Sequence, residues 1–451
     1  MSYVELHARS AFSFLRGSST PESLVMRAKE LEMESIAVTD RDGLYGTARV
    51  HHRAEELEMK GIVGMEITME DESVLPVLVC SRDGYQSLCR MLTRAKLRAP
   101  KGQSRVTWAE LEEHATGLIA LTGDAEGPLV RAIESGDRDA PMAMLTRLQR
   151  IFGRDDRLSI EVQRHRLRGD QRRVRALMEL AERSGLPLVA TNGVRYATKE
   201  GRLLHDAFTA LRHHTTLDDA GLKLAPNSQH FLKGEKEMRE LFVDMPGAVD
   251  RSARIAEKAI AGFTLQDLGY QFPEYPVEAG HNQDSFLRER VLEGARDRLG
   301  SLSRKLKDTL DGTTIRKQID DELSLISELK FSGYFLVVWS IVKFCRDSGI
   351  SVQGRGSAAN SVVCFSLGIT NANPTEHKLM FSRFLSRRQK SWPDIDLDLP
   401  SGDRRESVIQ EMYRRFAPHG AAMTANVITY RGRSAMREMG KVIGLAEDVV
   451  S

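Results

Sequence analysis

Residues 391–400 read SWPDIDLDLP, where Asp394, Asp396 and Asp398 alternate with aliphatic residues between two prolines. Successive side chains of a β-strand point to opposite faces, so the pattern predicts a short strand with three carboxylates on one face. Like charges this close repel each other unless a cation lies among them. Such aspartates serve metal-dependent phosphoryl or nucleotidyl transfer and phosphate-ester hydrolysis. Alone, an acidic triplet is more often a solvated strand edge or an adventitious Ca²⁺ site.

A glycine-rich loop precedes this strand in SVQGRGSAANSVVCFSLGI (351–369). The loop lies between an apolar strand and a helix expected to start near Ala358. Glycines let the backbone approach an anion, and the amides at a helix start favour a phosphate. A guanidinium and a hydroxyl would add charged and neutral donors. Gly-Ser followed in the same domain by Asp-x-Asp is the minimal layout of a nucleotidyltransferase palm. The phosphate-binding candidates are Gly354, Arg355, Gly356 and Ser357.

The bulk properties are those of a folded chain of about two to four domains, since it has 451 residues, 41 % apolar and 28 % charged. No apolar run reaches the roughly 18 residues of a membrane span, and the N-terminus lacks the apolar core of a signal peptide. We therefore expect a cytoplasmic location and no membrane partner. The cysteines show no paired metal-ligand spacing, which favours reduced thiols.

Basic residues gather around the aspartate strand. From Phe331 onward, 16 Lys and Arg residues accompany 11 Asp and Glu residues. Such a cluster is either a set of solvated helix faces or a surface that follows a phosphate backbone. The candidates for DNA contact are Arg387, Arg388, Lys390, Arg404 and Arg405.

The first 260 or so residues alternate short β-branched runs with amphipathic stretches, which predicts a mainly parallel sheet or barrel. The segment 263–283 is rich in Pro, Gly and aromatics and is interpreted as a linker. Helical stretches follow over 284–299 and 313–329. Because the chain ends inside a helical pattern, we expect the protein to continue past Ser451. The predicted strands are 3–6, 35–39, 61–67, 75–80, 117–122, 158–162 and 186–191.

Longer motifs in the second half are FSGYFLVVWSIV, GRGSAANSVVCFSLGIT, FSRFLSRRQKSWPDIDLDLPSGDRRESVIQEMYRRF and ANVITYRGRSAMREMGKVIGL. They resemble the palm of bacterial C-family DNA polymerases, the family of the DNA polymerase III α-subunit. The N-terminal residues resemble that family's PHP (polymerase and histidinol phosphatase) domain. YVELHARSAFSFLRG, GLYG and LGYQFPEYPVEAG are most similar to the error-prone, damage-inducible ImuC-type branch.

The resemblance implies an α/β fold in four parts. A PHP-type distorted β/α barrel of seven strands would span 1–262, followed by a linker over 263–283. An incomplete palm of the polymerase β nucleotidyltransferase type, with helical insertions, would span 284–425. The start of a thumb would follow over 426–451.

The resemblance also implies function, namely a DNA-templated DNA polymerase of the error-prone, translesion type that acts in the DNA damage response. Asp394 and Asp396 would be the catalytic carboxylates that bind Mg²⁺, with Asp398 as a supporting neighbour. The family's third catalytic aspartate would lie beyond Ser451, so this chain alone is expected to be inactive. The implied partners are primer-template DNA, deoxynucleoside triphosphates, mutasome accessory proteins and, through other subunits, a sliding clamp.

The PHP-like part departs from the family's metal-ligand pattern. Several of its polar residues follow predicted strands, where barrel sites form. Arginine, which has no lone pair for a metal and stays protonated, replaces four ligands. We therefore expect no PHP metal and neither phosphoesterase nor proofreading activity, with the guanidiniums paired to Asp40, Glu66 and neighbouring acids; a bound anion is a further outcome. The residues of this degenerate site are His7, Arg9, Arg16, Asp40, Arg41, Glu66, His165 and Arg195.

Two other functions compete with polymerase activity. A PHP-type metal-dependent phosphoesterase or exonuclease is disfavoured by the missing ligands. A non-catalytic scaffold module of a polymerase complex would retain the palm for folding or partner contact alone. Primer extension with Mg²⁺ distinguishes a polymerase from a scaffold.

Overall fold

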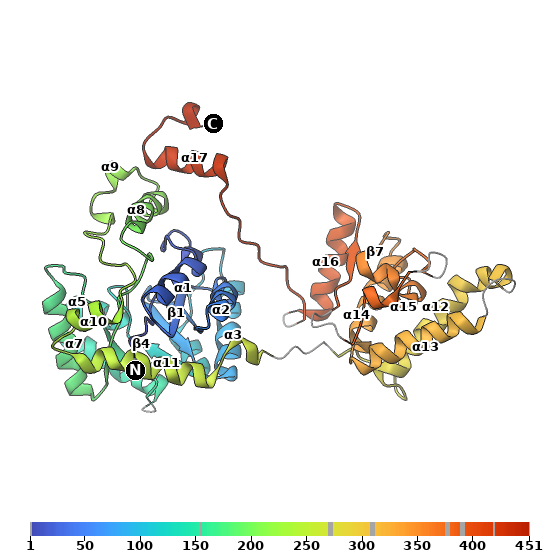
Figure 1. The fold of residues 1–451 in the computed structure, drawn as a ribbon, viewed down its shortest axis with the longest axis horizontal. Coiled ribbons are helices and arrows are strands. Elements are labelled where there is room, and N and C mark those ends of the chain that lie inside the picture. The colour runs from blue at the N-terminus through green and yellow to red at the C-terminus, as the bar shows by residue number, and fades with distance from the viewer. Residues whose placement is uncertain are drawn as a thin grey trace. The chain divides into compact units, whose positions relative to one another are not determined.

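The computed structural model describes residues 2–153, 156–268, 274–306, 312–374, 379–387, 393–417 and 420–450 (Figure 1). The chain divides into two compact units, of which one comprises Met1–Gly269 with Thr429–Ser451 and the other comprises Tyr270–Ile428. The predicted candidate phosphate-binding loop and aspartate strand both belong to the second unit.

The first unit is built on a six-stranded sheet whose strands neighbour one another in chain order. Three neighbouring pairs are parallel, but β3 is antiparallel to both β2 and β4. The predicted, mainly parallel sheet missed this reversal, which follows from the short turn between β2 and β3; a parallel connection needs a dozen or more residues. The strands are β1 (Ser35–Arg41), β2 (Lys60–Thr68), β3 (Val74–Val79), β4 (Leu118–Leu121), β5 (Leu158–Val162) and β6 (Leu188–Ala190).

The N-terminal segment closes this sheet. Ala8 forms parallel bridges with both Val38 of β1 and Val194, which follows β6. The Thr39 amide donates to the Ala8 carbonyl at 2.7 Å, and the Val194 amide donates to the His7 carbonyl at 2.9 Å. The two ends of the sheet are thereby joined into a distorted barrel. The predicted strand over 3–6 is not a regular strand, because the segment pairs through isolated bridges.

Helices surround the barrel and complete its apolar core. Thr20 caps α1, which begins at Pro21 as its sequence predicts. β1 and β3 are buried, and their apolar side chains share core clusters with those of α1 and α3. The helices of this unit are α1 (Pro21–Glu30), α2 (Thr47–Glu56), α3 (Arg82–Arg98), α4 (Trp108–His114), α5 (Pro128–Glu134), α6 (Ala140–Phe152), α7 (Asp170–Ser184), α8 (Gly201–Arg212), α9 (Leu217–Ala220), α10 (Glu235–Leu241), α11 (Pro246–Gly262), α17 (Gly432–Val442) and α18 (Glu447–Val450).

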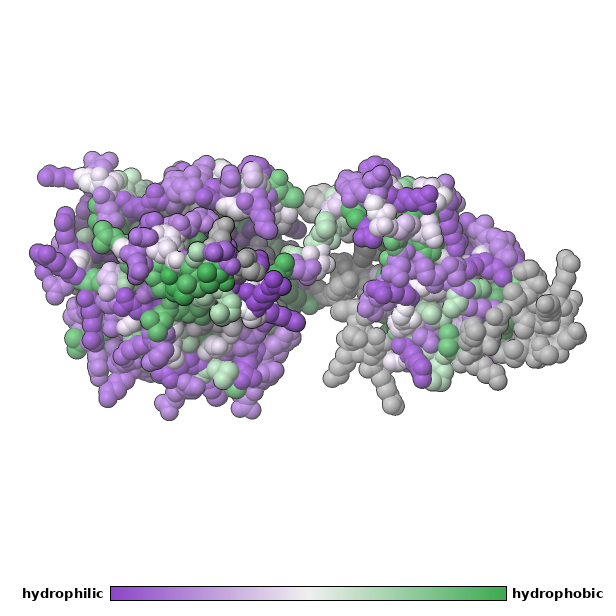
Figure 2. All heavy atoms as spheres, turned by 90° about the horizontal axis from the view of Figure 1, so that it is seen from above, coloured by the Kyte–Doolittle hydropathy of each residue, from purple (hydrophilic) through white to green (hydrophobic). Residues whose placement is uncertain are grey.

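The last helices pack on the first unit. Val442 of α17 is 1 % exposed and lies against Ala207 and Ala210 of α8. The resemblance implied the start of a thumb over 426–451, and Thr429–Ser451 are grouped with the first unit here. Figure 2 shows a patch of apolar residues on the face of this unit that is seen from above. Met436 of α17 and Ile443 directly after it are exposed. The predicted domain boundaries stay predictions.

The second unit is mainly helical. Its apolar core is formed by α12, α13, α14 and α15, and it includes Phe335, Leu336 and Val363. Among the described residues, no single helix is long and apolar enough to cross a membrane. α13 and α14 reach that length and hydropathy only when they are taken together, as a pair bent by 115°. The elements are α12 (Gln283–Leu306), α13 (Gly312–Glu328), α14 (Ser332–Asp347), β7 (Gln353–Arg355), α15 (Val362–Ser366), β8 (Asp396–Asp398) and α16 (Asp403–Phe416).

Candidate functional site

The glycine-rich loop and the aspartate strand lie side by side. β7 and β8 form a two-stranded antiparallel sheet in which Arg355 is paired with Asp396. Gly354 is opposite Leu397, and Gln353 is opposite Asp398. The two short motifs, which are about 40 residues apart in the chain, therefore form one surface.

The alternation of the strand determines which side chains reach solvent. Asp396 and Asp398 have side chains that are 61 % and 59 % exposed, and Asp394, two residues before β8, is exposed as well. Ile395 and Leu397 are partly buried against the apolar core of the unit. The aliphatic face anchors the strand, so the carboxylates are presented on an open surface.

Arg355 supplies a cation beside these carboxylates. Its Nε lies 3.3 Å from Oδ1 of Asp398 and 4.0 Å from Oδ2 of Asp396. All three side chains are well exposed, so each contact contributes little to stability, typically about 0–1 kcal/mol. The guanidinium can therefore leave the aspartates for an incoming phosphate at small cost.

Two glycines shape the loop. A Cβ at Gly354 would lie 2.6 Å from the carbonyl oxygen of Ile369, which accepts the Gly354 amide at 2.7 Å. Gly356 has φ +70°, a left-handed conformation that favours glycine. The helix predicted near Ala358 begins as a 3-10 turn over Gly356–Asn360, and α15 follows after Ser361, whose hydroxyl caps it.

Glu322 of α13, which the sequence reasoning missed, holds the start of α15. Its buried carboxylate accepts hydrogen bonds from the Ser361 hydroxyl at 2.8 Å and from the Val362 and Val363 amides at 3.1 and 3.0 Å. Burial raises the pKa of Glu322, against the hydrogen bonds that lower it. An acid among the apolar positions Ile319, Leu323 and Ile326 is the sequence signal that could have revealed it.

The residues at this surface fit a hard cation. Carboxylate oxygens of Asp394 and Asp396 are the ligand type that Mg²⁺ prefers, and their exposure leaves room for water and phosphate oxygens. Within the described ranges, however, no group of three or more His, Cys, Asp or Glu side chains could hold a metal ion. Further ligands would have to come from elsewhere, including substrate.

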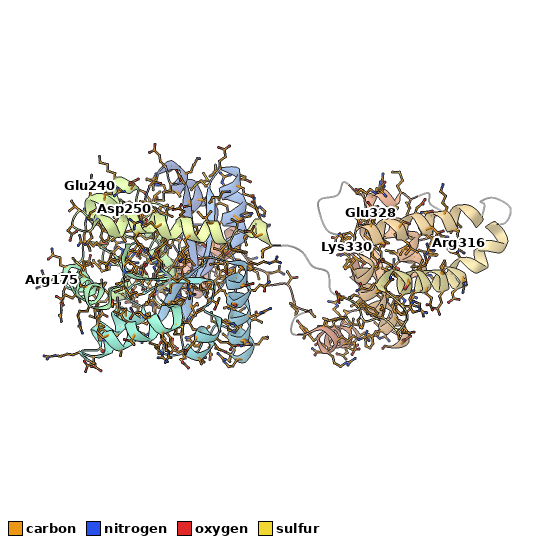
Figure 3. The ribbon with its side chains drawn as sticks, turned by 90° about the horizontal axis from the view of Figure 1, so that it is seen from below. Arg175, Glu240, Asp250, Arg316, Glu328 and Lys330 are labelled. Atoms are coloured by element: carbon orange, nitrogen blue, oxygen red, sulfur yellow. The ribbon has the colours of Figure 1, made fainter. Side chains whose placement is uncertain are left out.

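The DNA-contact candidates differ in their surroundings. Arg387 donates three hydrogen bonds, at 2.8–3.0 Å, to the carboxylate of Glu328 at the end of α13. Glu328 is labelled in Figure 3. Arg404 and Arg405 are exposed in the first turn of α16. Arg388 and Lys390 lie outside the described residues.

The centre of the first unit's barrel is an ion-pair network around Glu66. Glu66 accepts from Nε of Arg9 at 2.7 Å and from Nε of Arg41 at 2.6 Å, and it lies 2.6 Å from Nε2 of His7. The other His7 ring nitrogen lies 2.7 Å from Glu161. All of these side chains are buried, so each charge depends on its partners.

Further acids complete the network. Arg9 contacts Asp124 at 2.9 Å, and Arg41 contacts Glu126 at 2.8 Å. Both acids follow β4, a position at which barrel sites form, and this strand-end rule could have revealed them. Burial would raise the pKa of Glu66, but Arg41 and Arg9 hold it well below the usual value.

Two predicted members of the degenerate site, Asp40 and His165, lie outside the Glu66 network. Asp40, expected to pair with arginine, instead accepts hydrogen bonds from the Ser10 and Ser13 hydroxyls at 2.7 and 2.6 Å. Asp40 binds the serines rather than arginine because the tight 3-10 turn at Ala11–Ser13 places their hydroxyls over its carboxylate. His165 hydrogen-bonds the Asn192 carbonyl at 2.8 Å, and burial lowers its pKa to about 4.

Two protein families match different parts of the chain. Residues 285–451 match the family described as Bacterial DNA polymerase III alpha NTPase domain, and residues 5–165 match the family described as PHP domain. An amidohydrolase from Chromobacterium violaceum superposes with a TM-score of 0.31 at 14 % identity, covering 43 % of this chain and 87 % of that one. The family matches confirm the fold class predicted from the motifs.

Curated relatives extend over nearly the whole chain. One from Mycolicibacterium paratuberculosis is 41 % identical over 99 % of this chain and 41 % of its own length. One from Pseudomonas fluorescens strain Pf0-1 is 38 % identical over 100 % of this chain and 41 % of its own length. Both carry the name Error-prone DNA polymerase, which confirms the resemblance to that branch. The chain spans about two fifths of the length of these relatives.

Proposed function

The chain joins a PHP domain to a bacterial DNA polymerase III α-type domain, and from this premise we propose that it contributes to the active site of an error-prone DNA polymerase. The observation that carries the proposal is the pairing of β7 with β8, which brings Arg355 and the glycine-rich loop beside Asp396. Two carboxylates beside a phosphate-binding loop are what nucleotidyl transfer requires.

The proposed reaction is attack of a primer 3′-hydroxyl on the α-phosphorus of a deoxynucleoside triphosphate, with pyrophosphate as the leaving group. Asp394 and Asp396 would hold Mg²⁺, which supplies a lowered hydroxyl pKa and neutralises phosphate charge. Arg355 would move from the aspartates to the triphosphate, beside the exposed backbone of Gly356 and the Ser357 hydroxyl. These groups position the phosphates, which is the main contribution of protein to phosphoryl transfer.

The proposed partners follow from the same surface. Arg404 and Arg405, at the amino-terminal end of α16, would contact the phosphate backbone of primer-template DNA, and Arg387 could do so on leaving Glu328. A translesion role, a cytoplasmic location and accessory proteins such as a sliding clamp belong to the proposal as well. A third carboxylate from outside this chain would complete the metal site.

The test is primer extension by the complete polymerase carrying Asp396→Asn. Loss of one metal ligand should lower single-nucleotide incorporation by more than about 100-fold, since even outer-shell changes cost 10–100-fold. Binding of primer-template DNA should stay near wild type. Asp398→Asn, on the same exposed face, is the matched control and should retain most activity. Full activity of Asp396→Asn would refute the assignment.

A PHP-type phosphoesterase is disfavoured by the same contacts that define the barrel centre. Glu66, one of the surviving acids, is engaged by two guanidiniums and by His7. Arg9 and Arg41 stand where the family places metal ligands, and guanidinium offers no lone pair. We propose that the first unit supports the polymerase structurally and performs no metal-dependent hydrolysis.

A further inference from the structure

Three arginines of the first unit lie outside the Glu66 network. Arg16 is in the loop before α1, Arg195 follows β6, and Arg212 ends α8. All three are half-buried. Within the described residues, the guanidiniums of Arg16 and Arg195 form no hydrogen bond or ion pair, and Nε of Arg195 is buried without any partner. Unpaired buried charge is costly, so this grouping calls for a counter-ion.

Backbone contacts bring the three arginines together. The Ser18 amide donates to the Arg195 carbonyl at 2.9 Å, which holds the Arg16 loop against the segment after β6. His205 of α8 hydrogen-bonds the backbone of Arg16, and it is 3 % exposed. Arg212 lies seven residues after His205, on the same face of the helix. The charges of Arg16 and Arg195 both act on Arg212, so the three guanidiniums lie near one another.

The nearby acids are already engaged. Glu126 and Asp124 contact Arg41 and Arg9, and Glu66 contacts both of these arginines. Burial lowers the pKa of Arg195, and Arg9 adds to the effect. Burial and the charge of Arg16 lower the pKa of Arg212 to about 10. Burial and the neighbouring arginines thus outweigh the attraction of Glu126 that acts on both guanidiniums.

The formal charges indicate the kind of anion. The inner network has three cations, His7, Arg9 and Arg41, against four carboxylates. The inner network therefore has a net charge of −1, and adding the three outer arginines gives a net charge of +2. Guanidinium groups present planar pairs of donors that match phosphate oxygens. We propose that Arg16, Arg195 and Arg212 form a binding site for a phosphate-type dianion.

The dianion could be free phosphate or pyrophosphate, or the terminal phosphate of a nucleic acid. Thermal unfolding of the intact 451-residue chain distinguishes these sources. The chain is measured in chloride buffer, then with inorganic phosphate, with pyrophosphate, and with an oligonucleotide with or without a 5′-phosphate, all at equal ionic strength. At tenfold excess over Kd, the midpoint should rise by about 2–4 °C.

Variants then locate the binding. Arg195→Gln should abolish the rise in unfolding midpoint, and so should Arg212→Gln, which lies at a helix end that tolerates substitution better. In chloride, Arg195→Gln should be no less stable than wild type because it removes an unpaired cation. Arg166→Gln changes an exposed arginine of the same unit and should keep the rise. A rise with inorganic phosphate or pyrophosphate, or only with the 5′-phosphorylated oligonucleotide, supports the site when Arg195→Gln abolishes it. No rise with any probe, or an equal rise in Arg195→Gln, would overturn it.

Discussion

Among single residues, Glu66 and His7 lie at the centre of the ion-pair network in the barrel. Glu66 accepts hydrogen bonds from two arginines and His7, while His7 bridges Glu66 and Glu161. Burial lowers the pKa of His7, but the carboxylates of Glu161 and Glu66 outweigh it and raise the pKa to about 10. The imidazole is therefore a buried cation, with both nitrogens engaged rather than free for a metal.

This protonated state predicts a pH dependence. Folded His7 keeps its proton to higher pH than unfolded His7, whose pKa is about 6.5. Its contribution to the free energy of unfolding is complete below about pH 6.5 and lost as the pH rises toward 10. Urea unfolding of the first unit, followed by pulse proteolysis at pH 6.5 and 9.5, should show a steeper decline for wild type than for His7→Gln. Parallel declines would contradict a charged His7.

Among secondary-structure elements, α13 and α15 support the candidate active site. Three hydrogen bonds join Glu322 to Ser361 and the first amides of α15, directly after the glycine-rich loop. The loop's position therefore depends on a buried carboxylate that contacts neither β7 nor β8 in the hydrogen bonds described. Glu322 is a positioning residue for the proposed phosphate site.

Glu322→Ala should destabilise the second unit by about 2–4 kcal/mol, because it leaves a buried hydroxyl and two amides without acceptors. In the complete polymerase it should raise KM for the nucleotide more than it lowers kcat, because the loop that holds the triphosphate would loosen. Glu328→Ala on the same helix removes an exposed ion pair and should leave the stability unchanged. Equal effects of the two changes would argue against a positioning role.

Most elements could be predicted from the sequence, because strands and helices here follow local patterns. The six sheet strands coincide with predicted apolar runs, and the alternation at 394–398 correctly gave the exposed and packed faces. The pairing of arginines with Glu66 was predicted from the sequence. Other partners of buried charges were missed, since they come from distant segments. Asp40 is satisfied by two serines instead of arginine, and Arg9 finds Asp124, more than 100 residues away.

As a whole molecule, the chain has two compact units, and its C-terminal helices pack on the first. The contact of α17 with α8 is centred on Ala207, Ala210 and Val442, with Leu211, Leu217 and Met439 packed around them, so it should be sensitive to one buried charge. Met436 of α17 and Ile443 directly after it are exposed apolar side chains, which indicates that this segment is incompletely covered.

Val442→Asp should detach residues 429–451, because a carboxylate cannot be buried against Ala207 and Ala210 without a partner. Limited proteolysis within 420–431 should then be faster by more than about tenfold. Ile443→Asp, at a neighbouring position that is 63 % exposed, is the control and should cleave at the wild-type rate. Equal cleavage of both variants would contradict the docking of α17 on α8.

We propose that the second unit contributes to catalysis and that the arginine-filled centre of the first unit binds no metal. Elemental analysis of the intact chain, purified without chelators and then incubated with Zn²⁺, Mn²⁺ or Fe²⁺, tests this most directly. Because four guanidiniums occupy ligand positions, we expect less than stoichiometric retention of each metal after gel filtration. One or more equivalents of bound metal, lost on Glu66→Gln, would contradict it.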